Sequence, residues 1–547
     1  MSASLGWDSK PNIVLILADD LGFSDIGPFG GEIQTPRLTA LAAQGIIYRQ
    51  FYNTARCSPS RASLLTGRHP HDAGVGILTG DTRPLGYRGE VHAEVPMLSE
   101  VLRDRGYRTY LAGKWHLANQ VSQPSNAWPT ERGFDDFYGT IAGAGSYFEP
   151  TTLRRGIVAA EPEPGFYYTN AIGEASARFI TDHANSNNAD QPFFLFASFT
   201  APHWPLHAPQ SAINKYRGVF DRGWDELRQE RFTRARNLGV LGAESKLTAR
   251  DSGVPSWNSL GAEQRRLESK KMEVYAAQVE IMDTNIGKIL DALDVSGVAD
   301  ETMVIFLSDN GSCSENIPVG WVDDLPQVQE WSPGLTAEGT RVRSGNDPEY
   351  DPGGPETFQS YGRAWANLSN APFREYKHWV HEGGIATPLI IRHPGGAESI
   401  GQVISVPGQL PDIAATILSE CGFNAQDALS APGHPPTDGR NLIELAANSK
   451  SAGERYLFWE HEGNAAVRKG RWKAVRKFEE PWELYDMNLD RSELSDQASA
   501  CQDVLRRLVG SYQDWAREHS VVDYRAHLGQ SGEPDPLWLA AVWRPDD

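Results

Sequence analysis

The sequence predicts an α/β protein with a large, mixed but mostly parallel sheet sandwiched by helices. Residues 11–20 read PNIVLILADD, a continuous apolar run after a proline that is typical of a strand buried on both faces. Similar short runs recur at residues 107–112, 193–199 and 303–307, and helical patterns lie between them, most clearly over residues 272–293. Such alternation of strands and helices favours a parallel sheet.

Two short helices are predicted early in the chain. Thr35 is expected to cap the first, with Pro36 at its first position and Gly45 just past its end. The second covers residues 97–105, where three apolar side chains share one face. Both helices are therefore expected to pack against the sheet.

Three later stretches differ from this pattern. Residues 205–271 are charged and partly helical, which indicates an excursion on the surface, and residues 311–374 form a long segment rich in Gly, Pro, Ser and Asn. So long an irregular segment is more often functional than core. After about residue 447 short alternating runs, a Lys469-Gly470 turn and a helical pattern over residues 504–515 predict a small α+β domain with an antiparallel sheet. The predicted domains are residues 1–446 and 447–547.

Composition excludes several classes of protein. Lys and Arg number 51 against 71 Asp and Glu, a net charge of −20, which argues against nucleic acid and anionic membranes as partners. The four cysteines form no CxxC pair, so neither a zinc knuckle nor a disulfide framework is expected. No apolar run approaches the roughly 18 residues of a spanning helix, and residues 1–11 lack the apolar core of a secretion signal. The expected location is cytoplasmic, or periplasmic if a signal has been removed.

Polar side chains follow the predicted strands at the point where each strand ends. They are Asp19, Asp20, Lys114, His116, His203, Asp309 and Asn310. Ligands of open α/β sheets bind outside the carboxyl ends of the strands, so one crevice is expected to collect these groups. The three acids and the amide are hard oxygen ligands that suit Ca²⁺ or Mg²⁺ better than Zn²⁺. For either pair alone, Asp19-Asp20 or Asp309-Asn310, a role as turn residues or helix caps explains the sequence about as well as metal binding does.

A positively charged island surrounds Cys57. Residues 33–71 contain no acid but five arginines: Arg37, Arg49, Arg56, Arg61 and Arg68. Arginine recognises tetrahedral oxyanions through its planar fork of donors, although a solvated basic surface is the more common meaning of a charge run. Cys57 begins a turn that leads into an apolar segment, where helix N-terminal amides would add to an anion site. The residue types alone leave Cys57 either as a thiolate nucleophile or as a small buried apolar side chain.

Two motifs carry a resemblance to a known family. Residues 57–67 read CSPSRASLLTG and resemble the CxPSRxxxLTG signature of the formylglycine-dependent sulfatases, within the alkaline phosphatase superfamily. Residues 106–116, GYRTYLAGKWH, are similar to the second signature of that family. Residues 361–384 resemble most the bacterial arylsulfatase branch. The cues extend from residue 12 to about residue 473, so the resemblance covers most of the chain.

The resemblance implies a set of site residues and cofactors. A separate enzyme, a transient partner, would oxidise Cys57 to formylglycine, whose hydrated aldehyde attacks sulfur to form a covalent sulfo-enzyme intermediate. One Ca²⁺ per chain would be held by Asp19, Asp20, Asp309 and Asn310 with residue 57 beside it. The other matching positions are Arg61, Lys114, His116, His203 and Lys377, the last placed by its distance before Glu382-Gly383-Gly384.

The resemblance also allows roles to be assigned. His203 is the expected general acid for the leaving group, and His116 the base that breaks the intermediate while Arg61 holds the diol. Lys114, Lys377 and the metal would stabilise the sulfate oxygens, and Asp309 is a candidate base for the attack on sulfur, beside its metal role. Lys215 and His207 are spare candidates.

The expected function is hydrolysis of small-molecule sulfate monoesters, with aryl sulfates as substrates. Phe51, Phe148, Trp204 and Tyr361 are aromatic residues that would line such a pocket, although core packing is the commoner fate of each. The alternatives are a phosphonate or phosphate monoester hydrolase of the same superfamily, or a binding protein on the same scaffold. A missing cysteine or metal acid would favour the binding protein, and none is missing.

Overall fold

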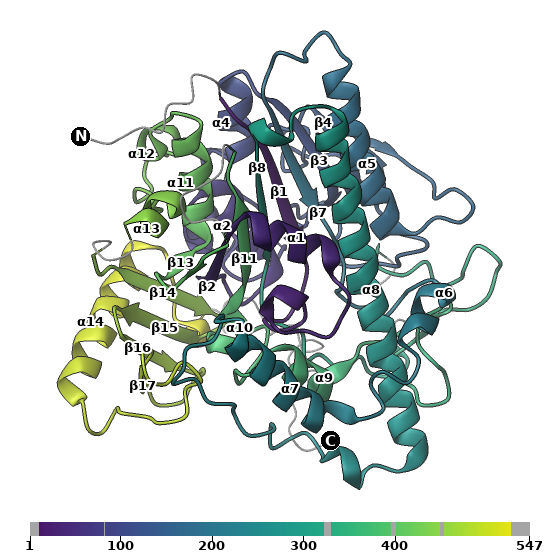
Figure 1. Cartoon of the computed structure of the whole chain (residues 1–547). Helices are drawn as coiled ribbons and strands as arrows, with labels where there is room; N and C mark the ends of the chain where they lie inside the picture. Colours follow the sequence, from purple (N-terminus) through teal and green to yellow (C-terminus); the bar gives the residue numbers. More distant parts are fainter. Residues whose placement is uncertain (1–9, 81–82, 322–329, 395–400, 449–452, 527–547) are drawn as a thin grey trace.

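The computed structural model describes residues 10–80, 83–321, 330–394, 401–448 and 453–526. Its centre is an eleven-stranded sheet with the strand order β12-β2-β11-β8-β1-β7-β3-β4-β5-β6, with β13 paired to β2 (Figure 1). The strands are β1 (Asn12–Ala18), β2 (Ile46–Tyr52), β3 (Arg108–Lys114), β4 (Asp136–Thr140), β5 (Leu153–Arg155), β6 (Val158–Ala159), β7 (Phe193–Ser198), β8 (Thr302–Ser308), β11 (Ala386–Arg392), β12 (Val403–Ile404) and β13 (Gly408–Gln409).

Strand β1 lies at the middle of this sheet and pairs in parallel with β7 and β8. All seven of its residues are buried, and they divide between two cores. Val14 and Ile16 belong to the core on one face of the sheet, while Ile13 and Leu15 belong to the core on the other. The apolar run at residues 11–20 is therefore a strand covered on both faces, as predicted. Strand β11 runs antiparallel to β2 and β8, which makes the sheet mixed.

Helices cover both faces of the sheet (Figure 1). One core includes side chains from α1 (Pro36–Gln44), α5 (Tyr168–Ala184), α6 (Gln210–Ile213), α7 (Gly223–Asn237), α8 (Ala262–Val295), α9 (Gly362–Ser369) and α10 (Glu382–Ile385). The other core includes side chains from α2 (Cys57–Thr66), α3 (Pro70–Ala73), α4 (Leu98–Asp104), α11 (Leu410–Glu420) and α13 (Leu442–Ala447), with α12 (Ala425–Ala428) packed against it. The predicted sandwich of helices around a mostly parallel sheet is confirmed.

A second, antiparallel sheet follows in the chain. It has the order β14-β15-β16-β17 and consists of β14 (Tyr456–His461), β15 (Asn464–Lys469), β16 (Trp472–Arg476) and β17 (Glu483–Asp486). Helix α14 (Gln502–Glu518) packs against it through Leu508, Tyr512 and Trp515. The small antiparallel sheet and its helix are confirmed, whereas the division at residues 446 and 447 stays a prediction. The last 21 residues of that predicted domain, and residues 1–9, lie outside the described residues.

Two local predictions need correction. The side chain of Thr35 does not cap α1; its hydroxyl accepts a hydrogen bond from the Gly27 amide instead, because the preceding 3₁₀ turn brings that amide close. Residues 205–271 are more than a surface excursion, since Trp224 and Trp257 are buried in the core beside Trp365 of α9. The charged appearance of α7 hid this contribution, because its Arg231 is fully buried in ion pairs rather than solvated. Two-residue strands β9 (Arg343–Ser344) and β10 (Thr357–Phe358) interrupt the irregular segment 311–374.

Within the part of the chain described here, no helix combines the length and apolar character that crossing a membrane requires.

Candidate active site

The polar residues at the strand ends lie together because the strands that carry them are neighbours. Asp19 and Asp20 follow β1, Asp309 and Asn310 follow β8, Lys114 ends β3 and His203 follows β7. These four strands pair in parallel in the order β8-β1-β7-β3, so their carboxyl ends share one edge. Gly113 has a φ of +114°, and a Cβ there would lie 1.9 Å from the Ser198 carbonyl oxygen. A glycine beside Lys114 therefore lets β3 approach β7 closely.

Three buried carboxylates and one amide form the centre of the site. Asp20 has a φ of 63°, and its amide donates to Asp309 Oδ1 at 3.1 Å. Asn310 Nδ2 donates to Asp20 Oδ1 at 2.7 Å. Burial raises the pKa of Asp309 to about 7, with Asp19 and Asp20 adding to the rise. Three carboxylates that are buried together away from water require positive charge nearby.

Three cations supply that charge. Lys114 Nζ lies 2.6 Å from Asp19 Oδ2, and Arg61 Nη2 lies 3.1 Å from Asp309 Oδ2. Lys377 Nζ lies 2.9 Å from Asp20 Oδ2. Burial opposes the ionisation of Asp19, yet Lys114, His203 and Arg61 hold its pKa below the ordinary value. The structure thus places Lys377, which sequence reasoning located only by spacing, in the same cluster as the strand-end residues.

The free oxygens of the cluster are the kind that a hard cation uses. Asp19 Oδ1 and Asn310 Oδ1 are buried, and neither has a hydrogen-bond partner among the residues that the structure describes. Candidate ligand atoms of Asp19, Asp20 and His203 all lie within 4.8 Å of one another. A buried oxygen without a donor is costly, and a divalent ion would satisfy both of these oxygens. Oxygen-rich ligands of this type fit Ca²⁺ or Mg²⁺.

Cys57 is the first residue of α2, and every residue of that helix is buried. Its side chain is only 3% exposed, and the charged groups that act on its thiol are Lys114, Lys377, Asp19 and Asp309. Burial raises the pKa of the thiol, and the two lysines only partly offset this. The thiolate interpretation of Cys57 is therefore disfavoured, because the unmodified side chain stays protonated.

Two histidines complete the cluster. His203 Nε2 lies 3.3 Å from Lys377 Nζ and 3.4 Å from Asp20 Oδ2, while its Nδ1 contacts the Trp204 carbonyl oxygen at 2.6 Å. His116 has a φ of 58° and a buried Nδ1 with no hydrogen-bond partner. Burial, together with Lys114 and Arg61, lowers the pKa of His116 well below its ordinary value. A neutral His116 can accept a proton, which is the protonation state a base requires.

Two further residues support the site and were not predicted. Ser198, at the end of β7, accepts a hydrogen bond from Arg61 and donates to the Lys114 carbonyl at 2.7 Å. Glu315 is buried, pairs with Arg56 at 3.0 Å and accepts from Trp204 Nε1 at 2.6 Å. The available signal for Glu315 was its position in the irregular segment only six residues after Asp309.

Several predicted candidates lie elsewhere. Phe51 and Tyr361 are core residues and Phe148 packs against the core, because each faces an apolar layer rather than the strand ends. Only Trp204 lies beside the site, with its ring centroid 4.5 Å from that of His203. Lys215 pairs with Glu280 at the surface, and His207 contacts the Thr357 carbonyl. These two spare candidates are therefore outside the cluster.

The basic island around Cys57 separates in the fold. Arg61 enters the site, Arg56 pairs with Glu315, and Arg37 pairs with Asp291 at the surface. Arg68 donates to the carbonyl groups of residues 429 and 435. Arg49 lies on β2 and has no ion pair among the described residues. The five arginines are therefore close in the sequence but do not form one surface in the folded protein.

Comparisons with known proteins bear on this arrangement. A family model described as Sulfatase matches residues 11–422. An uncharacterized sulfatase of Schizosaccharomyces pombe is 33% identical, covering 94% of this chain and 94% of its own. An arylsulfatase of Klebsiella aerogenes is 32% identical, covering 80% of this chain and 92% of its own. The crystal structure of Ps i-CgsB in complex with k-i-k-neocarrahexaose has a TM-score of 0.66 at 22% identity, covering 96% of this chain and 98% of that one.

Proposed function

Because this chain belongs to the sulfatase family and is a sulfuric ester hydrolase, we propose that it hydrolyses aryl sulfate monoesters with formylglycine at position 57. The single observation that carries the proposal is the setting of Cys57. It begins a buried helix and is acted on by Lys114, Lys377 and the carboxylates of Asp19 and Asp309. A reactive group at this position would lie near lysines that can bind a sulfate ester and near carboxylates that can bind a metal ion.

Asp19, Asp20, Asp309 and Asn310 are the residues that would hold one Ca²⁺. The unpartnered oxygens of Asp19 and Asn310 support this assignment, since both belong to the hard ligand type that Ca²⁺ prefers. Calcium would supply positive charge next to residue 57 and neutralise carboxylates that otherwise repel one another. In this structure Asp19 Oδ2 pairs with Lys114 and Asp20 Oδ2 pairs with Lys377, so two of the residues that would hold the ion are also the partners of the two lysines.

The modified residue would supply a hydroxyl nucleophile from its hydrated aldehyde, in place of a thiol whose pKa is raised. Lys114 and Lys377 would hold the nonbridging sulfate oxygens, whose charge grows as the ester bond breaks. His203 would give a proton from Nε2 to the leaving oxygen. Burial lowers the pKa of its ring, so this role needs the protonated form, which the Asp20 carboxylate 3.4 Å from Nε2 favours. The sulfate would then be held on residue 57.

Release of that sulfate requires removal of a proton from the second hydroxyl of residue 57, which restores the aldehyde as the bond to sulfate breaks. His116 is the proposed base, because its lowered pKa keeps the ring neutral. Asp309, whose pKa burial raises to about 7, is the candidate base for the earlier attack and would take the proton of the attacking hydroxyl. Arg61 is anchored by Ser198, Asp309 and the Lys114 carbonyl, and would orient the diol.

The aryl preference is supported by the arylsulfatase relative and by Trp204 beside His203. Trp204 belongs to an aromatic cluster with Trp321 and Phe358, and this apolar surface lies next to the proposed leaving-group position. Steady-state kinetics on matched aryl, alkyl, choline and carbohydrate sulfates test the proposal. A preference for carbohydrate sulfates of tenfold or more in kcat/KM would overturn the aryl assignment.

The second candidate function, hydrolysis of phosphate or phosphonate monoesters, rests on the same cluster of cations. A phosphate ester control in the same panel separates it from sulfate hydrolysis. We propose that the natural reaction partner is a small sulfate ester and that a formylglycine-generating enzyme acts transiently on Cys57.

A further inference from the structure

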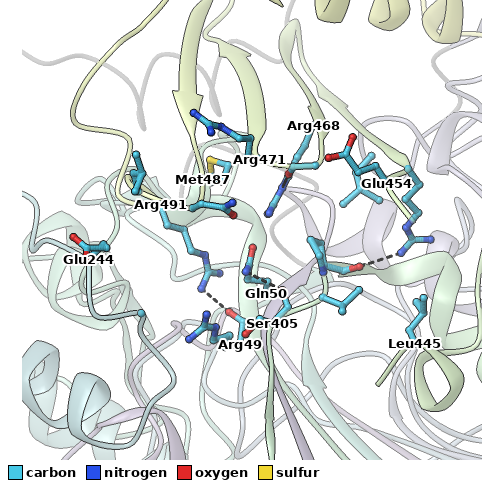
Figure 2. Close-up of a pocket in the computed structure, with 18 of the residues that line it drawn as sticks. Arg49, Gln50, Glu244, Ser405, Leu445, Glu454, Arg468, Arg471, Met487 and Arg491 are labelled. Carbon is cyan, nitrogen blue, oxygen red and sulfur yellow. Dashed lines mark hydrogen bonds between the residues drawn. The ribbon is translucent and has the colours of Figure 1, made fainter. Parts of the chain in front are cut away.

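A large cavity lies away from the proposed active site. Its volume is about 690 Å³, and it is bounded by the edge of the main sheet at β2, the segment that links β12 and β13, and the small sheet. Figure 2 shows that its lining side chains come from both sheets and from the loop that carries Glu244. None of the proposed catalytic residues lines it. The cavity is therefore a separate feature of the molecule.

The lining of this cavity is unusually basic for a chain with a net charge of −20. Six arginines contribute to it: Arg49, Arg440, Arg455, Arg468, Arg471 and Arg491. Glu244 and Glu454 are the acids among its lining residues, and neither forms an ion pair within the part of the chain that the structure describes. Positive charge thus exceeds negative charge around the cavity.

Three of these arginines are already paired. Arg455 pairs with Asp412, Arg471 pairs with Asp486 at 2.5 Å, and Arg491 Nε lies 2.8 Å from Glu382 Oε2. Their charges are therefore at least partly compensated within the fold. Arg455 and Arg471 therefore need no ligand, whereas the ion pair of Arg491 uses only its Nε and leaves its two Nη nitrogens to other partners.

Arg49 and Arg468 have no carboxylate partner among the described residues. Arg468 donates to the Tyr52 hydroxyl at 2.7 Å and to the Gly470 carbonyl at 3.1 Å. Within the described ranges, the guanidinium of Arg49 makes a single long hydrogen bond, 3.4 Å, to the Gly239 carbonyl. Burial and the neighbouring Arg491 lower the pKa of Arg49, as expected where positive charges gather.

Arg491 joins these two arginines into one group. Its guanidinium carbon lies 5.9 Å from the centre of the Tyr52 ring, and that of Arg468 lies 5.6 Å from the same ring. Arg491 Nη1 donates to the backbone carbonyl of Arg49, while its buried Nη2 has no hydrogen-bond partner in the part of the chain that the structure describes. An unsatisfied buried guanidinium nitrogen is costly, so a missing acceptor is indicated at this point.

Charge in the network behind the cavity is also unbalanced. Glu382 is fully buried and pairs with both Arg491 and Lys473, and Lys473 also pairs with Glu493. By formal counting, the carboxylates of Glu382 and Glu493 leave an excess of two positive charges over Arg49, Arg468, Arg491 and Lys473, and this excess equals the charge of Glu244 and Glu454 in the cavity lining.

We propose that this cavity binds a small organic molecule through a phosphate or sulfate group held by Arg49, Arg468 and Arg491. A tetrahedral oxyanion presents several acceptors and matches the planar fork of donors of each guanidinium. The volume lies within the range of small-molecule sites, about 300–1,000 Å³. Apolar side chains of Val406, Leu457 and Met487 line the same cavity and give the organic part a surface to contact.

The first test locates the anion directly. Crystals of the full-length protein are soaked in selenate, whose anomalous signal marks a tetrahedral oxyanion. The expected result is a peak within hydrogen-bond distance of Arg49 and Arg491. Absence of any selenate from the cavity, with selenate present in the active site of the same crystals, would overturn the proposal.

The second test measures affinity in solution. Calorimetric titrations with inorganic sulfate, inorganic phosphate, sugar phosphates, nucleoside monophosphates and sulfated sugars are compared between wild type, Arg49→Met and Arg37→Met. Arg49→Met should weaken the cavity site by tenfold or more, because it removes one charged fork, and Arg49→Lys should lie between it and wild type. Arg37→Met removes a surface arginine that does not line the cavity, and should bind as wild type does.

Each outcome of the titration either supports or contradicts the proposed anion site. Tighter binding of the phosphate series or of the sulfated series identifies the anionic group, whereas an organic anion that binds no tighter than the inorganic ion means an adventitious ion only and contradicts the proposal. Equal affinities of Arg49→Met and Arg37→Met would also contradict it. Aryl sulfatase turnover of Arg49→Met is expected to equal that of wild type, so failure of the proposed function and failure of this site are distinguishable.

Discussion

Lys114 Nζ lies 2.6 Å from Asp19 Oδ2, and both side chains are fully buried. A buried ion pair of this kind is sensitive to the loss of either partner, because the remaining charge is left uncompensated in a dry environment. In the proposed mechanism the same lysine must also reach a sulfate oxygen. A divalent ion held by Asp19 would supply that carboxylate with a further positive partner, so that Lys114 could also contact a sulfate oxygen.

Replacing Asp19 by Asn should therefore lower metal affinity together with activity. The amide keeps the shape of the side chain but removes one of the negative charges that hold the cation, and loss of a single ligand charge is expected to cost at least tenfold in affinity. Metal content after dialysis, measured by plasma mass spectrometry, checks this. Asp291→Asn, which changes a surface carboxylate paired with Arg37, serves as the control. Undiminished calcium in Asp19→Asn would contradict the metal assignment.

Active protein should carry an aldehyde or its hydrate at position 57. The thiol has a raised pKa in its buried setting, so unmodified Cys57 is a poor nucleophile at neutral pH. Peptide mass spectrometry of the region 57–67 measures the modified fraction, and kcat per molecule should rise in proportion to it. Cys57→Ala should fold and yet lose turnover, because only a small side chain is removed. Full activity in a preparation that holds only the thiol would reject this prediction.

Much of the fold follows from local patterns that a sequence displays. The run at residues 11–20 is apolar throughout because both faces of β1 are covered, and the strand-end acids follow from the parallel pairing of β1 with β8. Lys377 could be placed only through family resemblance, because it reaches Asp20 from a loop 357 positions away. No periodicity records a contact of that kind.

Other features escaped prediction for definable physical reasons. Glu315 lies in a segment without regular structure, so its pairing with Arg56 depends on a loop path that composition does not reveal. Trp224 and Trp257 are buried beneath a charged helix because Arg231 is neutralised by Asp25 and Glu32 inside the fold. A charge pattern was interpreted as solvent exposure where it in fact marks buried ion pairs.

Glu315 provides a test of stability against pH. Its pKa is lowered to about 2; burial opposes ionisation, but Lys377, Arg56 and His203 favour the charged form more strongly. A lowered folded-state pKa stabilises the protein above the unfolded value, near 4.5, and this contribution is lost as the pH falls towards 2. Glu315→Gln should therefore be less stable than wild type at pH 7, by roughly 3 kcal/mol if the whole shift is realised.

The stability gap between wild type and Glu315→Gln should narrow between pH 4.5 and pH 2. Melting temperatures measured at about pH 7 and about pH 3 check this, and Glu263→Gln, at an exposed carboxylate, controls for the general effect of removing an acid. A gap that is constant across this range would show that the Glu315 carboxylate is not ionised in the folded protein.

The last prediction concerns the choice between sulfate and phosphate. A sulfate monoester carries one negative charge and a phosphate monoester nearly two at neutral pH, so the phosphate ester relies more on each cation of the site. With one divalent ion, Arg61, Lys114 and Lys377 facing three carboxylates, the site has a formal charge of about +2 and can bind either ester. Wild type should prefer 4-nitrophenyl sulfate over 4-nitrophenyl phosphate, with slow phosphate hydrolysis still detectable.

Lys114→Ala should reduce kcat for both esters, on the order of 10²–10³-fold by analogy with the removal of one oxyanion donor. The loss should be larger for the phosphate ester, because its transition state carries more charge on the oxygens that Lys114 contacts. Steady-state kinetics of both proteins on the two matched esters measure this difference, and circular dichroism establishes that the variant folds despite the buried partner Asp19. A wild-type preference for the phosphate ester would overturn the sulfatase assignment. It would indicate a phosphoryl-transfer enzyme of the superfamily, in which the same cations bind the more highly charged ester.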